Sequence, residues 1–383
     1  MNFSTSIPLV DLGAQQEEIA DEVEIGLKEV FAQTSFIGGP AVAEFERAYA
    51  EFLGAGHCVG VANGTDALEL ALRSCGVCPG GEVIVPANTF IATAEAVSRI
   101  GARPVPVDVD PVHLLIDPVC AAEAVGPRTQ AIVPVHLFGQ TAPVERLESL
   151  AESCGAALVE DAAQSQGATR YGRFAGTLGQ AAGTSFYPGK NLGAAGDAGA
   201  VITNDPAVAA RVRLLGAHGS LVRYQHEAIG MNSRLDTLQA VVLNAKLRRL
   251  HGWNQRRREA AERYTSLLSG VPGIILPTSA AGNVDVWHLY VIRVEDRDRV
   301  LAELQAAGIG AGIHYPVPLH LSPAYRELNH GRGDFPVAEQ AADTMLSLPI
   351  YPHITAGQQE YVAERLIQAA NGLIGNRRRR DVG

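Results

Sequence analysis

Residues 82–107 read EVIVPANTFIATAEAVSRIGARPVPV, in which a helix-like stretch lies between two strand-like stretches. The flanking runs, EVIVP (82–86) and RPVPV (103–107), are continuously apolar or β-branched, and residues 89–100 have helical spacing. A buried strand, a helix and a second buried strand in this order are typical of a parallel sheet covered on both faces.

The same alternation continues on both sides of this unit, from about residue 57 to 205. Further strand-like runs are HCVGV (57–61), AIVPV (131–135), AALVE (156–160), GTSFY (183–187) and GAVIT (199–203), and residues 65–75 and 143–153 have helical patterns. The pattern predicts an α/β fold with a mostly parallel sheet between helices. Because such sheets bind ligands beyond the carboxyl ends of their strands, residues at these ends are the candidates for chemistry.

The pattern changes towards the C-terminus. Residues 234–268 predict one long helix or two, and the turn-like residues 270–273 are followed by a strand-like WHLYVIRV and further helical patterns. We therefore expect an N-terminal arm and large domain over 1–250, a smaller α/β domain over 251–375 and a solvated basic tail over 376–383.

Composition excludes several classes of protein. Of 383 residues, 47% are hydrophobic and the net charge is −10, which disfavours a largely disordered chain and a general affinity for nucleic acid or anionic membranes. No apolar run approaches the length of a membrane span, so we expect a cytoplasmic protein. Cys75 and Cys78 have CxxC spacing without a second ligand pair, so we expect neither a metal nor a disulfide framework.

Two loops carry polar residues at strand ends. Asn63-Gly64-Thr65 joins the strand 57–61 to a helix, and such a helix start either binds an anion through its free N–H groups or is capped by Asn63 or Thr65. Glu160-Asp161 ends the strand 156–160, and a carboxylate there either caps the next segment or meets a ligand. The residues alone leave both choices open.

A lysine surrounded by glycines follows the strand 183–187. In the run GTSFYPGKNLGAAGDAGA (183–200), Lys190 is surrounded by glycines, which let the backbone approach a bulky ligand. A phosphate-binding P-loop is excluded because Asn191 follows the lysine in place of Ser or Thr. A nucleophilic lysine that forms a Schiff base is the better interpretation.

An ordered set of motifs then carries a resemblance that spans about residues 8–370. GTDALELAL, PANTFIATAEAV, PVDVDP, VHLFG, EDAAQSQGA, SFYPGKNLGAAGDAGA, GMNSRLDTLQAVVL, IHYPVPLHLSPAY and LSLPIYP resemble the nucleotide-sugar aminotransferase family. Its members are enzymes of fold type I, in the aspartate aminotransferase superfamily, that use pyridoxal 5′-phosphate (PLP). The resemblance implies this fold, this cofactor and transamination.

The resemblance also implies roles for individual residues. Lys190 would form the Schiff base with PLP and move the proton, and Asp161 would pair with the pyridine nitrogen. Gln164 would contact the ring hydroxyl and Phe90 would stack on the ring. The phosphate would be held by Gly64, Thr65 and Ser185, together with Asn232 from the second subunit of a homodimer.

The substrates implied are glutamate, which becomes 2-oxoglutarate, and a nucleotide-linked keto-sugar. The motifs look most like the subgroup that aminates carbon 3 of dTDP-linked 3-keto-6-deoxyhexoses. Alternatives are a 4-keto-sugar or a keto-cyclitol as acceptor, and a PLP-binding regulator without turnover. The candidate contacts to sugar or diphosphate are Tyr187, His314, Tyr315, Arg223, Tyr224 and His226, each of which has a structural alternative, as does His136.

Overall fold

The fold is built on a seven-stranded sheet. The structure, a computed structural model, describes the backbone of residues 6–380 and the side chains of residues 6–371. The sheet has the order β1-β9-β8-β5-β4-β2-β3, and β9 is antiparallel to both neighbours whereas the other strands are parallel. Its strands are β1 (His57–Val61), β2 (Glu82–Pro86), β3 (Arg103–Val107), β4 (Thr129–Ile132), β5 (Ala157–Asp161), β8 (Ala181–Ser185) and β9 (Gly199–Thr203). The prediction of a mostly parallel sheet is confirmed.

Both faces of this sheet are buried, because successive side chains along a strand point to opposite faces and both sets are apolar. In β2, Val83 and Val85 pack into one hydrophobic cluster, and Ile84 between them packs into another on the opposite face. The first face is covered by α4 (Gly64–Ser74), α5 (Ala92–Ile100) and α8 (Pro206–Gly216), and the second by α6 (Pro118–Glu123) and α7 (Val144–Cys154). α3 (Pro40–Leu53) packs beside β1 and β9.

Four predicted strands, β1, β2, β3 and β9, match the structure to the residue, and the others are shifted. β8 ends at Ser185, two residues earlier than predicted, because a turn follows in which the Lys190 N–H donates to the Tyr187 carbonyl at 2.8 Å. β4 ends at Ile132 and Val135 makes an isolated bridge to Asp161, since Pro134 has no N–H for the ladder.

A second hydrophobic core surrounds a small antiparallel sheet. This sheet has the order β10 (Ile274–Ile275), β12 (Tyr290–Val294) and β13 (Met345–Leu348), with α10 (Arg297–Ala306), α11 (Pro336–Thr344) and α12 (Ala356–Arg380) nearby. Its core includes Tyr264, Leu304 and Leu366. The remaining short elements are β6 (Thr169–Arg170), β7 (Arg173–Phe174), β11 (Asn283–Val284) and three 3₁₀ turns, Leu137–Gly139, Leu319–Leu321 and Pro323–Leu328.

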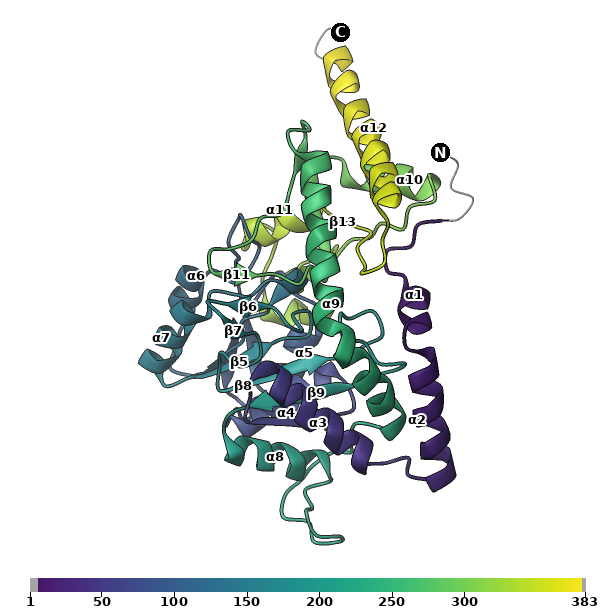
Figure 1. The fold of residues 1–383 in the computed structure, drawn as a ribbon. Helices are drawn as coiled ribbons and strands as arrows, with labels where there is room; N and C mark the ends of the chain where they lie inside the picture. Colours follow the sequence, from purple (N-terminus) through teal and green to yellow (C-terminus); the bar gives the residue numbers. More distant parts are fainter. Residues whose placement is uncertain (1–5, 381–383) are drawn as a thin grey trace.

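One long helix, α9 (Thr237–Leu268), connects the two cores (Figure 1). It packs against α3 and α12, and the N-terminal helices α1 (Leu12–Glu17) and α2 (Ala20–Gln33) lie along the same side of the molecule. The helix passes through residue 250, so the division at 250/251 stays a proposal that the separate second core supports. Of the basic tail, residues 381–383 lie outside the described residues.

In the described part of the chain, no helix combines the length and the apolar character that crossing a membrane requires.

Candidate active site

The carboxyl ends of the parallel strands open into a cavity of about 660 Å³ between the two cores. Leu9 and Val10 of the N-terminal arm and His288 from the second core also line it. Of the residues singled out from the sequence, the cavity brings together Gly64, Thr65, Phe90, Asp161, Gln164, Ser185, Tyr187, Lys190, His314 and Tyr315.

The N-terminus of α4 forms one wall of the cavity. Asn63 is the N-cap, and its Oδ1 accepts the Asp66 N–H at 2.8 Å, which leaves the N–H groups of Gly64 and Thr65 for another acceptor. A Cβ on Gly64 would lie 2.6 Å from the Cβ of Ser185, so the close approach of this helix start to β8 requires glycine. Capping and anion binding, the two interpretations of this motif, are therefore compatible.

Asp161 lies buried at the end of β5 with both oxygens engaged. Its Oδ2 accepts from Thr93 Oγ1 at 2.7 Å and its Oδ1 accepts from the Ala163 N–H at 3.1 Å. Burial raises the pKa of this carboxyl, while the two hydrogen bonds and the charge of Lys190 oppose the shift. Asp161 thus both caps the next segment and faces the cavity.

Lys190 occupies the turn after β8. A Cβ on Gly193 would lie 2.3 Å from the Pro188 carbonyl oxygen, so the chain around the lysine is too tightly folded for a side chain there. Burial lowers the pKa of the Lys190 amine to about 8, and the charge of Asp161 acts in the opposite direction. This shift brings the pKa of the amine much closer to neutral pH than that of an exposed lysine, although the protonated form still dominates there.

Two aromatic rings and an amide line the cavity between the cores. Phe90 and Tyr315 have ring centroids 5.2 Å apart, and the Phe90 ring is half exposed towards the cavity. Gln164 accepts the Phe138 N–H at 2.7 Å and donates through Nε2 to the Tyr315 hydroxyl at 3.0 Å. His314, beside Tyr315, contacts Ser347 Oγ through Nδ1 at 2.8 Å.

His136 has a structural role. Its Nδ1 accepts the Ala142 N–H at 3.0 Å, so its Nε2 carries the proton and donates to Glu160 at 2.8 Å. Glu160 is fully buried and also accepts the N–H groups of Gly176, Leu178 and Gly179. This network holds the loops next to Asp161 in place, and His136 does not line the cavity.

Four further candidates lie away from the cavity of this single chain. Arg223 and Tyr224 stack on each other at 4.9 Å in the loop after α8, where Tyr224 is 78% exposed, and His226 contacts the His218 carbonyl. Asn232 lines an adjoining pocket that shares Asn63 and Asp197 with the cavity. Their roles in binding stay predictions.

Sequence reasoning missed Thr93 and His288. Thr93 lies on α5, and its position three residues after Phe90 offered a helical spacing as the signal. His288 lies just before β12 of the small sheet, far along the chain from Lys190, and no local motif pointed to it.

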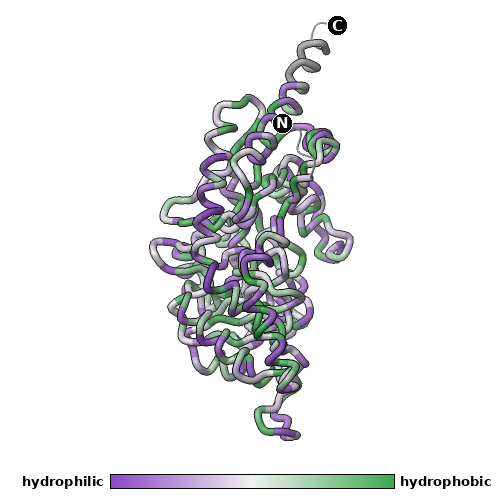
Figure 2. The backbone as a smooth tube through the Cα atoms, turned by 45° about the vertical axis from the view of Figure 1, so that its right-hand side comes forward, coloured by the Kyte–Doolittle hydropathy of each residue, from purple (hydrophilic) through white to green (hydrophobic). Residues whose placement is uncertain are grey.

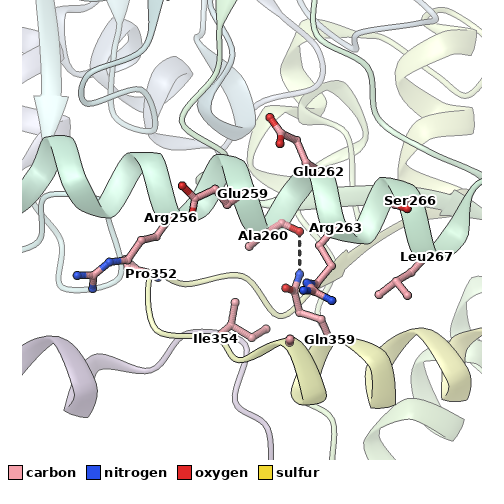
Figure 3. A pocket seen from close by; sticks show the side chains of 11 residues that line it. Arg256, Glu259, Ala260, Glu262, Arg263, Ser266, Leu267, Pro352, Ile354 and Gln359 are labelled. Atoms are coloured by element: carbon pink, nitrogen blue, oxygen red, sulfur yellow. Dashed lines mark hydrogen bonds between the residues drawn. The ribbon is translucent and has the colours of Figure 1, made fainter.

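A separate groove lies between α9 and the segment that leads into α12 (Figure 3). It shares no residue with the first cavity, and Gln359 Nε2 donates across it to the Ala260 carbonyl at 2.7 Å. Its charged side chains, including Arg256, Glu259 and Arg263, come from one side of α9. The groove lacks the lysine and carboxylate pair, so we place the chemistry in the first cavity.

The chain is similar over nearly its whole length to known proteins. The sequence profile of the DegT/DnrJ/EryC1/StrS aminotransferase family matches residues 16–367. The chain is 48% identical over 360 residues to the erythromycin biosynthesis sensory transduction protein EryC1 of Saccharopolyspora erythraea, covering 94% of this chain and 98% of that protein. It is 46% identical over 370 residues to the dTDP-3-amino-3,4,6-trideoxy-α-D-glucose transaminase of Streptomyces venezuelae, covering 95% and 98%.

Among solved structures, DesV of S. venezuelae in complex with a ketimine intermediate superimposes with a TM-score of 0.94. The two chains are 45% identical, and the match covers 96% of this chain and 99% of DesV. The arrangement of both cores is therefore the same in the two proteins.

Proposed function

The chain belongs to the DegT/DnrJ/EryC1/StrS aminotransferase family, and on this premise we propose that it transfers an amino group from glutamate to carbon 3 of a dTDP-linked 3-keto-6-deoxyhexose, with PLP bound at Lys190. The observation that carries the proposal is the pairing of an amine of lowered pKa with a buried carboxylate in one cavity.

The cavity suits PLP in its charge and shape. The free N–H groups at the start of α4 suit a phosphate, because a helix N-terminus carries partial positive charge. The exposed face of Phe90 suits a planar ring, and the close approach of Gly64 to Ser185 brings the Ser185 hydroxyl next to the helix start. When bound, PLP supplies a protonated ring that takes up the electrons of a broken C–H bond.

Asp161 and Lys190 would then have separate tasks. The Asp161 carboxylate, oriented by Thr93 and the Ala163 N–H, would hold a proton at the ring nitrogen. The Lys190 amine would remove a proton from the substrate carbon and return it, which requires a pKa close to the working pH. Gln164, held by Phe138 and Tyr315, would fix the edge of the ring.

The choice of a dTDP-linked 3-keto-sugar is supported by the S. venezuelae relative, whose name describes a 3-amino dTDP-sugar. Tyr187, from the turn after β8, and His314 and Tyr315, from much later in the chain, line the same cavity and would contact the sugar. Binding energy from the nucleotide would position the reacting carbon, so a free keto-sugar should lose rate as well as affinity.

We also propose that the protein acts as a homodimer in which Asn232 reaches the partner's cavity. Apolar side chains are exposed along α2 and the segment after it, at Ile25, Phe31, Phe36 and Ile37. The loop after α8, which protrudes at the foot of the molecule, adds exposed apolar residues, and the hydropathy colouring shows hydrophobic stretches there (Figure 2). A two-fold interface would bury these residues on both copies.

The test is to offer the purified, PLP-loaded protein a 3-amino and a 4-amino dTDP-6-deoxyhexose separately. We expect the 3-amino compound alone to change the visible absorption of the bound cofactor in a single turnover and to yield glutamate from 2-oxoglutarate. A response to the 4-amino compound alone would overturn the position of amination. A response only to amino-cyclitols would show that the acceptor is a keto-cyclitol and not a nucleotide-linked sugar. No response to any amino compound would favour a PLP-binding regulator without turnover.

A further inference from the structure

A chain of buried amides runs behind Lys190 from α9 to His288. Asn254 Nδ2 donates to the Gln166 backbone carbonyl at 2.8 Å, and Asn254 Oδ1 lies 2.9 Å from Asn191 Nδ2. Asn191 Nδ2 also lies 2.9 Å from the Val286 carbonyl, and Asn191 Oδ1 lies 3.2 Å from His288 Nδ1. All three side chains are buried.

Two backbone carbonyls set the direction of the hydrogen bonds that link Asn254, Asn191 and His288, because a carbonyl oxygen only accepts. The Gln166 carbonyl requires Asn254 to donate through Nδ2, so Asn254 Oδ1 faces Asn191 and must accept. The Val286 carbonyl independently requires the nitrogen of Asn191 on that side. Asn191 therefore presents its oxygen to His288, and His288 Nδ1 must carry a proton.

His288 is also neutral in this environment. Burial lowers the pKa of its imidazole well below the usual value, and the nearby charges of Lys190, Arg257 and His314 lower it further. A neutral ring with its proton on Nδ1 has a lone pair on Nε2. His288 thus enters the cavity as an acceptor of hydrogen bonds and not as an acid.

Lys190 lacks an acceptor of its own. Among the described residues, its Nζ makes no hydrogen bond. The oxygens of Asp161 accept from Thr93 and from the Ala163 N–H, and the proposed function assigns this carboxylate to the ring nitrogen of the cofactor and not to the amine. His314 Nδ1 is occupied by Ser347. His288 and Lys190 line the same cavity, and the lysine charge acts on the imidazole.

We infer that His288 is a positioning residue whose Nε2 accepts a hydrogen bond from Lys190 Nζ once turnover has released that amine from the bound cofactor. The inference rests on the proposed function of Lys190. The hydrogen bond holds the amine towards the substrate carbon between the two halves of the reaction. It also stabilises the protonated amine and so raises its pKa relative to a cavity without the acceptor.

The tautomer is tested directly, without activity, by long-range ¹H–¹⁵N NMR on protein labelled with ¹⁵N-histidine. The His288→Asn variant identifies the His288 signals by their loss. We expect a protonated Nδ1 and an unprotonated Nε2 across neutral pH, with and without PLP. An Nε2-protonated ring or an imidazolium would overturn the inference.

Two substitutions of His288 separate the role of the acceptor at Nε2 from that of the hydrogen bond between Nδ1 and Asn191. In His288→Asn, the amide N–H replaces Nδ1–H and keeps the bond to Asn191, but the acceptor at Nε2 is lost. In His288→Gln, the amide oxygen lies near the position of Nε2, but the bond to Asn191 is lost. The readouts are the melting temperature and the pH dependence of the single-turnover rate with glutamate alone, which does not depend on the identity of the sugar.

We expect His288→Asn to keep the wild-type melting temperature, to react about tenfold more slowly, and to shift the pH limb due to Lys190 to lower pH. His288→Gln should keep the rate and the pH limb but melt at a lower temperature. The groups that face this imidazole and enter the profile are Lys190, Arg257 and His314. A His288→Asn variant with the wild-type rate and pH profile would show a purely structural histidine and overturn the inference.

Discussion

Thr93 Oγ1 donates a hydrogen bond of 2.7 Å to Oδ2 of Asp161, which joins the first turn of α5 to the carboxyl end of β5. Because a hydroxyl has one proton, the contact of 2.9 Å between Thr89 and Thr93 must be a donation from Thr89. Asp161 is thus held by a relay from Thr89, in the segment before α5 that also contains Phe90, through Thr93 in the first turn of α5.

This relay makes activity depend on Thr93 in a pH-dependent way. Burial raises the pKa of the Asp161 carboxyl and the Thr93 hydrogen bond opposes that rise, so Thr93→Val should raise the pKa further. The carboxyl is then neutralised at higher pH, and the acidic limb of kcat/KM should move upward while the plateau changes little. Thr89→Val is the matched control, with a smaller shift, and a downward shift in Thr93→Val would contradict the assignment.

Replacing the carboxylate itself should be more severe. Asp161→Asn keeps the size of the side chain but removes the negative charge that would hold a proton on the cofactor ring. We expect the rates of both half-reactions to fall by at least about 100-fold, with a smaller effect on PLP affinity. Rapid-mixing absorbance measurements with glutamate and with 2-oxoglutarate test this, and unchanged turnover would remove Asp161 from the mechanism.

The covalent link can be mapped with little ambiguity because the chain has three lysines, Lys28, Lys190 and Lys246. Borohydride reduction followed by peptide mass mapping should place PLP on Lys190. Lys246 is an internal control, because burial also lowers its pKa to about 8 although it lies outside the cavity. Lys190→Ala should fold normally and lose the covalent cofactor. PLP found on Lys246 would show that a lowered amine pKa alone, and not the cavity, determines which lysine is labelled.

Gly64 and Gly252 form a matched pair of glycine substitutions. A Cβ at Gly64 would collide with Ser185, so Gly64→Ala should destabilise the protein by about 1–3 kcal/mol and weaken PLP binding. A Cβ at Gly252, inside α9, would meet nothing within 4 Å, so Gly252→Ala should stabilise the protein by about 1 kcal/mol. Chemical denaturation and PLP titration measure both effects, and equal behaviour of the two variants would contradict the close approach at α4.

Shared active sites predict complementation between inactive variants. In a mixed dimer of Lys190→Ala and Asn232→Ala chains, one cavity would combine an intact Lys190 with an intact Asn232 from the other chain. After unfolding and refolding together, we expect about a quarter of the wild-type activity. Light scattering should show a dimer throughout. Mixtures no more active than the separate variants would exclude a shared site.

The sequence by itself determined the layered sheet and most of the candidate residues that line the cavity. The strands at 57–61, 82–86, 103–107 and 199–203 are predictable because burial on both faces requires unbroken apolar runs, and the ends of such strands converge on one edge of a sheet. Gly64, Asp161 and Lys190 lie at or after the carboxyl ends of β1, β5 and β8, so their positions along the chain already implied a common cavity.

Tertiary structure alone decided how these residues are held. The proton on His288 Nδ1 depends on the backbone carbonyls of Gln166 and Val286. These carbonyls orient the side-chain amides of Asn254 and Asn191, and the Asn191 oxygen then faces His288. Thr93 meets Asp161 because α5 packs beside the end of β5, and Tyr315 meets Gln164 because the second core closes over the first. Hydrogen bonds are short and directional, so they depend on how the elements pack in three dimensions, which no local sequence pattern records.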